Sequence, residues 1–204
     1  MIAIIDYGAS NLSSVAKAIA SLGYNARVTS KPKQITEAKV IILPGVGAAG
    51  DAMDKLRKWG MIEPIQQVIT ENRPFLGICL GLQVLLNATE ESGGCQCLDL
   101  IPGKVVRLPA GVKVPHMGWN QVKQKSFHPI FDEIPDEANF YFVHSYYGDV
   151  SDESLVIGET NYGLTFCSVL AKDNLIATQF HLEKSGLQGL KMLHNFLEFA
   201  GVKK

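Results

Sequence analysis

Cys79 stands in the segment Gly77-Ile78-Cys79-Leu80-Gly81, directly after the apolar run Pro74-Phe75-Leu76. This order predicts a short buried strand, a sharp turn and then a helix that starts at Leu80 and continues through Leu85. The pattern G-x-C-x-G is the cysteine form of the nucleophile elbow, in which the reactive side chain projects from a strained strand-to-helix turn. Glycines on both sides avoid clashes in such a turn. Because the N-terminus of the helix favours the thiolate, Cys79 is the predicted nucleophile.

A cysteine nucleophile needs a general base and a group that orients this base. His181 is the predicted base, because it follows the strand-like run 175–180, and Glu183 lies two residues further on. In an extended segment, residues i and i+2 point to the same face, so Glu183 can hold the imidazole of His181. His128 precedes a proline in an expected loop and His194 falls on an amphipathic helix, so neither is a strong candidate.

The glycine-rich run Gly45-Val46-Gly47-Ala48-Ala49-Gly50 matches the dinucleotide-binding pattern G-x-G-x-x-G. It follows Pro44, does not lie in the first strand–helix unit, and has no acidic residue after the next strand, so a dinucleotide site is not favoured. The backbone N–H groups of such a turn can instead bind a developing oxyanion. We interpret Gly45, Val46 and Gly47 as one side of an oxyanion hole, with the N–H of Leu80 as the other donor.

The elements that must position these residues alternate in the first half of the chain. Apolar runs predict strands at 2–5, 26–28, 40–43 and 74–76, separated by helical patterns that end near residues 22, 56 and 71. Asn11 is the expected N-cap of the first helix. Strands that alternate with helices predict a mostly parallel twisted sheet flanked by helices.

The second half of the chain has a different pattern. Short strand candidates at 105–108, 139–143, 155–157 and 165–170 have no clear helix between them, which predicts an added antiparallel region. A final helix, from about Gly186 to Ala200, is expected to bury Leu187, Leu190, Leu193 and Leu197. No linker or repeat divides the chain, so one domain over residues 1–204 is expected.

The composition is that of an ordinary soluble protein, with 47% hydrophobic and 19% charged residues and a formal net charge of −1. This charge favours neither nucleic acid nor a membrane surface as a partner, and no apolar run is long enough to span a bilayer. Four cysteines without a signal peptide indicate free thiols in a reducing cytoplasm. Cys95-Gln96-Cys97 lacks a second pair at ligand spacing, so no metal site is expected and a surface loop is the simpler interpretation.

Six runs resemble those of the class I glutamine amidotransferases and, among these, of the glutaminase subunits of imidazole glycerol phosphate synthase. They are Asp6–Gly8 with Asn11–Leu12, Leu43–Gly47, Gly77–Gln83, Pro115–Asn120, Tyr141–Tyr146 and Gln179–Ser185. The elbow and the His-x-Glu segment mark the superfamily, whereas Pro-His-Met-Gly-Trp-Asn marks the subunit. The resemblance implies a flavodoxin-like fold, no cofactor, and a triad of Cys79, His181 and Glu183 that converts glutamine to glutamate and ammonia.

The resemblance also implies where substrate and partner bind. It assigns Gln83, His144 and Ser145 to the glutamine site. The implied partner is a (β/α)8-barrel cyclase subunit that consumes the ammonia, in a heterodimer. The residues expected at or near the contact with this cyclase are Asn11, His116, Met117, Trp119 and Lys184.

Two positions depart from the family's pattern, since Leu182 stands where proline is usual and Ser10 where glycine is frequent. Without the proline, the segment that holds His181 and Glu183 is expected to be less rigid. Three alternatives stay open at this point: a glutaminase of anthranilate or pyridoxal phosphate synthesis, a nucleophile-elbow thiol hydrolase, and an inactive scaffold. The run from Pro115 to Asn120 argues against the first, and the intact triad argues against the last.

Overall fold

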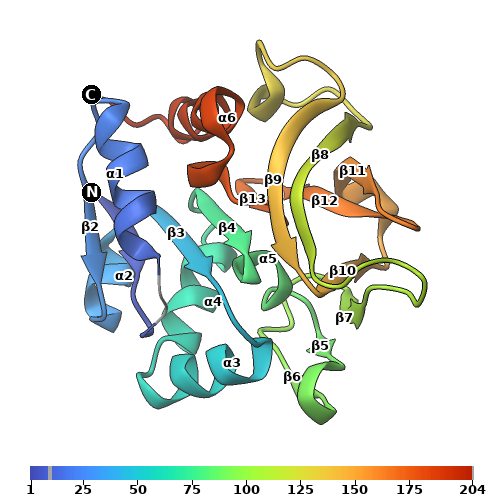
Figure 1. Cartoon of the computed structure of the whole chain (residues 1–204). Coiled ribbons are helices and arrows are strands. Elements are labelled where there is room, and N and C mark those ends of the chain that lie inside the picture. Colours follow the sequence, from blue (N-terminus) through green and yellow to red (C-terminus); the bar gives the residue numbers. More distant parts are fainter. Residues whose placement is uncertain (9–10, 204) are drawn as a thin grey trace.

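The computed structural model describes residues 1–8 and 11–203, so Ser10 lies outside the described residues. Its strands form a nine-stranded sheet in the order β2-β1-β3-β4-β13-β12-β11-β8-β9 and a four-stranded sheet in the order β10-β7-β5-β6 (Figure 1). The strands are β1 (Ile2–Ile5), β2 (Ala26–Thr29), β3 (Val40–Gly45), β4 (Phe75–Cys79), β5 (Ala88–Thr89), β6 (Cys95–Gln96), β7 (Gly103–Arg107), β8 (His116–Gln124), β9 (Ala138–His144), β10 (Tyr146–Val150), β11 (Val156–Asn161), β12 (Thr165–Lys172) and β13 (Leu175–Thr178).

The helices are α1 (Leu12–Ser21), α2 (Pro32–Glu37), α3 (Ala49–Lys58), α4 (Ile62–Thr70), α5 (Leu80–Gln83) and α6 (Gly186–Phe199). Four 3-10 turns, at Glu91–Gly93, Pro129–Phe131, Glu153–Leu155 and Leu182–Lys184, complete the described elements. No helix in the described ranges has the length and apolar character needed to cross a membrane.

The large sheet changes from parallel to antiparallel pairing at β13. Strands β2, β1, β3, β4 and β13 pair in parallel, whereas β12, β11, β8 and β9 are added by antiparallel pairing. The predicted fold class, a mostly parallel sheet with an added antiparallel region, is therefore confirmed. Because β13 pairs in parallel with β4, the segment after β13 lies beside the segment after β4.

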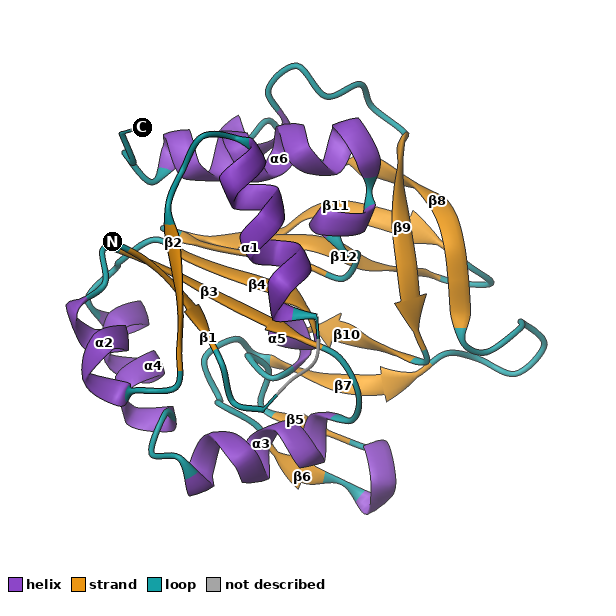
Figure 2. Cartoon of the chain, turned by 60° about the vertical axis from the view of Figure 1, so that its left-hand side comes forward, coloured by secondary structure: helices purple, strands orange, loops and turns teal. Residues whose placement is uncertain are grey.

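Helices cover both faces of the parallel strands, with α1 and α6 on one face and α2, α3 and α4 on the other (Figure 2). Alternate residues of each strand divide between the two layers: Ile4 and Ile42 pack with α1 and α6, whereas Ile5 and Ile41 pack with α2, α3 and α4. Burial on both faces explains why these strands are continuous apolar runs.

Several elements differ from the sequence-based expectation. Strand β8 was not predicted because most of its side chains alternate between partly and fully exposed, and its polar residues and Gly118 conceal the pattern. Strand β10 and helix α2 were also not predicted. The prediction that Leu187 is buried is wrong, since this side chain is 84% exposed in the first turn of α6.

Two predictions about helix starts also need correction. Asn11 precedes α1, but its side chain caps no backbone N–H of this helix, and its backbone is left-handed with φ of 79°. The helix after Cys79 is a single turn that ends at Gln83 and not at Leu85. The helix dipole that acts on the Cys79 sulfur therefore comes from one turn. Cys95 lies in the short strand β6, not in a loop.

Candidate active site

Cys79 occupies a strained turn between β4 and α5. Its φ of 55° and ψ of −104° are unusual for a residue with a side chain, and such conformations persist only where the surroundings enforce them. The close packing explains the two flanking glycines. A Cβ on Gly81 would lie 1.9 Å from the carbonyl oxygen of Leu43, and one on Gly77 would lie 2.8 Å from the carbonyl oxygen of Gly81. The elbow predicted from G-x-C-x-G is present.

His181 and Glu183 meet as expected, with 2.8 Å between His181 Nδ1 and Glu183 Oε1. His181 Nε2 is buried and has no close hydrogen bond to any described residue. Burial alone would lower the pKa of His181, but the interactions with Cys79 and Glu183 outweigh it and raise this pKa to about 10. The arrangement therefore favours an imidazolium between a carboxylate and a thiol.

The backbone that carries His181 is fixed by Ser185 and by β9. The Ser185 hydroxyl donates to the carbonyl of His181 at 2.6 Å and accepts from the N–H of Tyr141 at 2.9 Å. The N–H of His181 donates to the carbonyl of Tyr141 at 3.0 Å. These hydrogen bonds anchor the backbone of His181, although Leu182 stands where the family usually has proline.

A cavity of about 510 Å³ opens beside Cys79. The glycine-rich loop from Val46 to Ala48 and Leu80 form one side of it, and the segment from Val143 to Tyr146 forms another. Glu91 and Lys184 are the charged side chains among its lining residues in the described chain. The Glu91 carboxylate accepts a hydrogen bond of 2.8 Å from the N–H of Ala49, which ties it to the start of α3.

Gln83 is buried but does not line this cavity. Its amide nitrogen donates to the carbonyl of Tyr146 at 2.7 Å and to Gln179 Oε1 at 3.2 Å. Gln179 in turn directs its amide nitrogen at the sulfur of Cys79, 3.6 Å away. In this structure Gln83 therefore supports the cavity wall from behind.

His144 also reaches the cavity wall, yet both its ring nitrogens have protein partners. Nδ1 lies 2.9 Å from the carbonyl of Tyr146, and Nε2 lies 2.9 Å from His116 Nδ1. Burial lowers the pKa of His116 to about 4 and that of His144 to about 3, so both rings are neutral at neutral pH. Because each neutral ring carries a single N–H, the hydrogen-bond directions are fixed: His144 donates to the carbonyl of Tyr146 and accepts from His116.

Sequence reasoning missed three residues near the nucleophile: Tyr7, Glu91 and Gln179. Tyr7 lies against the glycine-rich loop, since a Cβ on Gly45 would fall 2.2 Å from its hydroxyl. Burial, with a smaller effect of Cys79, raises the pKa of Tyr7 well above its usual value. Gln179 and Tyr7 lie inside the runs that carry the family resemblance, whereas Glu91 has no local sequence signal.

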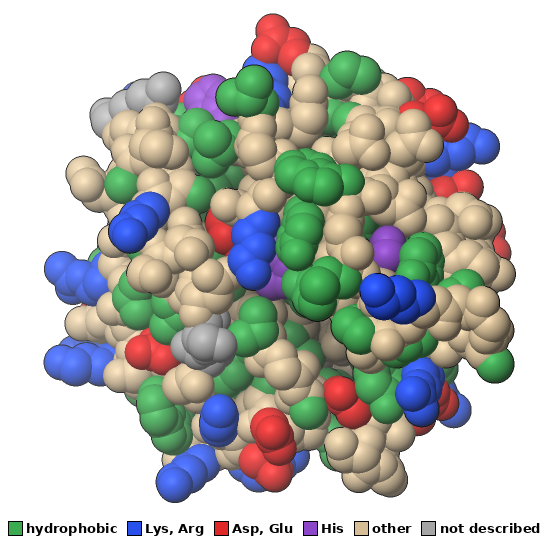
Figure 3. All heavy atoms as spheres, viewed as in Figure 1, with side chains coloured by type: hydrophobic (Ala, Val, Ile, Leu, Met, Phe, Trp, Pro, Cys, Tyr) green, Lys and Arg blue, Asp and Glu red, His purple; other side chains and the backbone are tan. Residues whose placement is uncertain are grey.

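The residues predicted to meet a partner divide into exposed and buried ones. Trp119 is 57% exposed and Met117 is 61% exposed, and hydrophobic side chains cluster over β8 and β9 on this face (Figure 3). Lys184 is exposed and Asn11 is half-buried. His116 is only 3% exposed and stacks on Tyr162, so its side chain cannot contact a partner directly. Leu187 is also exposed, and it follows Gly186, where an added Cβ would lie 3.8 Å from the Trp119 ring.

Residues 3–199 match the family model of glutamine amidotransferase class-I. A crystal structure of a glutamine amidotransferase superposes with a TM-score of 0.78 at 18% identity, covering 99% of this chain and 100% of that one. A glutamine amidotransferase from Thermotoga maritima superposes with a TM-score of 0.66 at 18% identity, covering 99% of this chain and 85% of that one. At such identities these structures establish the fold alone. The chain belongs to the class I glutamine amidotransferases.

Curated relatives narrow the class. Imidazole glycerol phosphate synthase subunit HisH of Dehalococcoides mccartyi strain CBDB1 is 52% identical over 205 residues, covering 100% of both chains. The HisH subunit of Geobacter sulfurreducens is 52% identical over 204 residues, covering 97% of this chain and 98% of that one. Within the class, the chain falls in the HisH family.

Proposed function

We propose that this chain is the glutaminase subunit of an imidazole glycerol phosphate synthase, with Cys79, His181 and Glu183 as its catalytic residues. It hydrolyses L-glutamine to glutamate and supplies the ammonia to a cyclase subunit in histidine biosynthesis. The observation that carries the assignment of residues is the arrangement of His181 between the Glu183 carboxylate and the Cys79 thiol, beside an open cavity.

In the first half of the reaction, the Cys79 thiolate attacks the side-chain amide carbon of glutamine. The oxyanion of the tetrahedral intermediate lies toward the N–H of Leu80 and the loop from Gly45 to Gly47, of which Val46 and Gly47 line the cavity. One such donor is worth roughly 3 kcal/mol of the barrier. The imidazolium of His181 then gives its proton to the leaving ammonia, which leaves a thioester on Cys79.

In the second half, neutral His181 takes a proton from water, and the hydroxide attacks the thioester carbon. The second oxyanion collapses, glutamate leaves, and the sulfur of Cys79 returns as a thiolate beside the imidazolium. Glu183 stabilises the positive ring in both halves and fixes its orientation through Nδ1. His181 acts first as an acid and then as a base. Its raised pKa favours the protonated form, which is the form that the first half of the reaction needs.

The charges of the cavity are complementary to an amino acid zwitterion. The Glu91 carboxylate suits the α-ammonium group of glutamine, and the ammonium of Lys184, which lines the same cavity, is available for the α-carboxylate. His144 and Ser145 line the same cavity, and we assign this segment to the side-chain amide of glutamine. A neutral ester offers no charges for Glu91 and Lys184 to bind, so the pocket suits an ester substrate less well than glutamine.

The proposed partner is a (β/α)8-barrel cyclase that covers the exposed side chains around the pocket. Trp119 and Met117 present exposed apolar side chains, and Lys184 adds a positive charge at the cavity. Ammonia released into water is protonated and lost as a nucleophile, so the acceptor subunit must close over the same face. Asn11 lies near this surface and connects it to Glu183.

The experiment is to treat the chain with a glutamine analogue that carries an electrophilic side chain, and to map the modified peptide. We expect label on Cys79 and none on Cys95, Cys97 or Cys167. In parallel, glutamate release from glutamine is measured with and without the cyclase, and should rise when the cyclase is added. Label on another cysteine would contradict the assigned nucleophile. Hydrolysis of esters without release of ammonia from glutamine would favour the thiol hydrolase.

A further inference from the structure

Cys95 and Cys97 form a pair of thiols outside the catalytic site. Cys95 opens strand β6, where it pairs with Thr89 of β5, and the N–H of Cys97 donates to the carbonyl of Asn87 at 2.9 Å. Both side chains are half-buried, and the Cys95 thiol is close enough to Cys97 to help raise the pKa of the Cys97 thiol. The two sulfurs therefore lie on the same side of the chain, as residues i and i+2 of an extended segment do.

The pair lies directly behind one wall of the glutamine pocket. Glu91, which lines the pocket, belongs to the turn between β5 and β6, only four residues before Cys95. The sulfur of Cys95 lies 3.8 Å from where a Cβ on Gly50 would be, in the first turn of α3. Because Glu91 also accepts from the N–H of Ala49 at 2.8 Å, the turn and the start of α3 are held together.

The backbone spacing makes a bond between these sulfurs strained. Two residues of extended chain span about 6.6 Å. This lies near the upper end of the roughly 4.4–6.8 Å between Cα atoms that a disulfide accepts. Closing the bond would shorten the segment, weaken the pairing of Cys95 with Thr89 and displace the turn that carries Glu91. Gly93 and Gly94, with φ of 91° and 86°, stand between Glu91 and Cys95 and can take up this change. Strained disulfides are also the easily reduced ones.

We propose that Cys95 and Cys97 form a reversible disulfide that weakens glutamine binding by moving Glu91. The regulation rests on the proposed glutaminase function, whereas the oxidation itself does not. The oxidant is a small disulfide such as oxidised glutathione. Burial and the neighbouring Cys95 raise the pKa of Cys97 to about 12, so Cys95 is the thiol that attacks first.

The exchange balances in two steps. The Cys95 thiolate attacks one sulfur of oxidised glutathione, which gives a mixed disulfide and releases one glutathione thiolate. Cys97 loses its proton to this base and attacks the sulfur of Cys95, which releases the second glutathione. Two protein thiols are oxidised and one glutathione disulfide is reduced to two thiols.

A metal site is the other use of a Cys-x-Cys pair. In residues 1–8 and 11–203, no third histidine, cysteine, aspartate or glutamate joins the two thiols in a cluster that could hold a metal ion. Structural zinc needs four ligands of this kind. The lack of further ligands among the described residues, together with the position of β6 beside the pocket wall, favours redox regulation over metal binding.

The test uses the Cys79→Ala variant, in which the nucleophile can be neither oxidised nor consumed. The protein is equilibrated with mixtures of oxidised and reduced glutathione, the free thiols are alkylated, and the peptides are mapped by mass spectrometry. Glutamine affinity is measured by calorimetry on both forms. We expect a Cys95–Cys97 bond that dithiothreitol reverses, and glutamine binding about tenfold weaker in the oxidised form, the worth of one hydrogen bond to a charged group.

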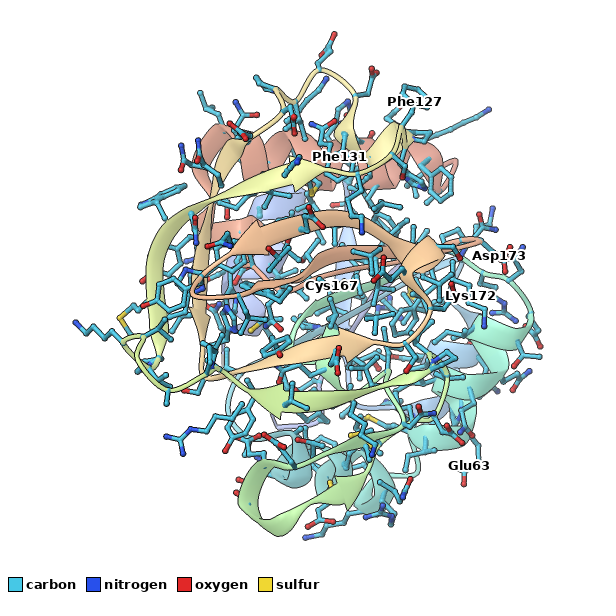
Figure 4. The ribbon with its side chains drawn as sticks, turned by 90° about the vertical axis from the view of Figure 1, so that its right-hand side faces the viewer. Glu63, Phe127, Phe131, Cys167, Lys172 and Asp173 are labelled. Carbon is cyan, nitrogen blue, oxygen red and sulfur yellow. The ribbon has the colours of Figure 1, made fainter. Side chains whose placement is uncertain are left out.

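The control variants are Cys79→Ala/Cys97→Ser, whose glutamine affinity should not respond to the oxidant beyond any mixed disulfide at Cys95, and Cys79→Ala/Cys167→Ser, which should respond like the parent. Cys167 is buried in β12 (Figure 4). Absence of the Cys95–Cys97 bond in any glutathione mixture would overturn the proposal, as would a bond that leaves glutamine affinity unchanged. If the reduced protein does not bind glutamine, the proposed function fails instead, and the disulfide is judged by the peptide map alone.

Discussion

Asn11 and Glu183, separated by 172 residues in the sequence, are joined by a hydrogen bond of 2.7 Å from Asn11 Nδ2 to Glu183 Oε1. The same oxygen lies 2.8 Å from His181 Nδ1. Glu183 Oε2 is buried and has no hydrogen-bond partner among the described residues. One carboxylate oxygen thus accepts both contacts, so the segment that enters α1 helps to orient the proposed triad.

Asn11→Gly should lower kcat for glutamine about tenfold or more, because a hydrogen bond to a charged group is lost. Glycine is the suitable replacement, since it accepts the left-handed backbone at φ of 79° without added strain. KM should change little, because Asn11 is a positioning residue and does not line the cavity. Steady-state kinetics in the presence of the cyclase, together with a thermal melt, separates a loss of orientation from a loss of fold.

Asn25→Gly is the matched control for this change, since Asn25 is an exposed residue just before β2, outside the catalytic cavity. It should leave kcat unchanged. An Asn11→Gly enzyme with normal kcat would mean that His181 alone orients the carboxylate.

The free energy of unfolding should fall as the pH rises from about 6.5 to about 10, because of His181. The pKa of this group is raised to about 10 in the folded chain from an ordinary value of 6.5. Between these values the folded state binds a proton that the unfolded state does not, so each step up in pH favours unfolding. Below this window both states are protonated, and the contribution of His181 is fully present.

Urea unfolding of the wild type and of Glu183→Gln across this pH window is the measurement. Glu183→Gln removes one cause of the raised pKa, so its stability should depend less steeply on pH. His128→Gln is the control, because burial lowers the pKa of His128 and this group stays neutral throughout the window. Equal slopes for the wild type and Glu183→Gln would show that Glu183 does not hold a charged imidazole.

The chemistry-bearing segments were predictable because each has a local signature. The strained turn at Cys79 needs flanking glycines, and the pairing of His181 with Glu183 follows from their spacing. The buried parallel strands were equally visible, because burial on both faces demands continuous apolar runs. For these elements, residues that are neighbours in the sequence are enough to predict the structure.

The rest depends on contacts between distant segments, which leave no local signal. Glu91 reaches the pocket through its bond to Ala49, and Asn11 reaches Glu183 across the fold. Strand β8 was missed because only a few of its side chains are buried, and Leu187 was assigned to the core because a helical pattern does not reveal which turn lacks a covering neighbour.

Leu182→Pro should destabilise the chain less than Leu182→Ala. Leu182 is buried in the core beneath α6, and truncation of such a leucine costs about 2–5 kcal/mol. It is also the first residue of a 3-10 turn, where an N–H has no partner within the turn and proline is tolerated. The ring fills part of the site and restricts the unfolded chain, which is worth about 0.4–1 kcal/mol. Urea unfolding of both variants is the measurement, and a larger loss for Leu182→Pro would show an unsuitable φ.

Trp119→Ala should weaken binding of the cyclase by about 2 kcal/mol or more, while the isolated glutaminase chain melts almost normally. Trp119 is 57% exposed and makes an edge contact with Tyr141, whose ring centroid lies 5.9 Å away, so little packing within the chain is lost. The measurements are titration calorimetry with the cyclase, cyclase-stimulated glutaminase activity, and a thermal melt of the isolated chain.

Phe127→Ala is the matched control, because Phe127 is an aromatic residue that is 93% exposed in the loop between β8 and β9, at the opposite end of this hairpin from His116 and His144 (Figure 4). Exposure alone therefore does not distinguish the two side chains, whereas position does. Phe127→Ala should leave affinity and stimulation unchanged, and Trp119→Ala should lower both together. If the two variants bind the cyclase equally well, the face around Trp119 is not the docking surface. If Trp119→Ala instead melts far below the wild type, its contact with Tyr141 carries stability, and the interface must lie elsewhere around the pocket.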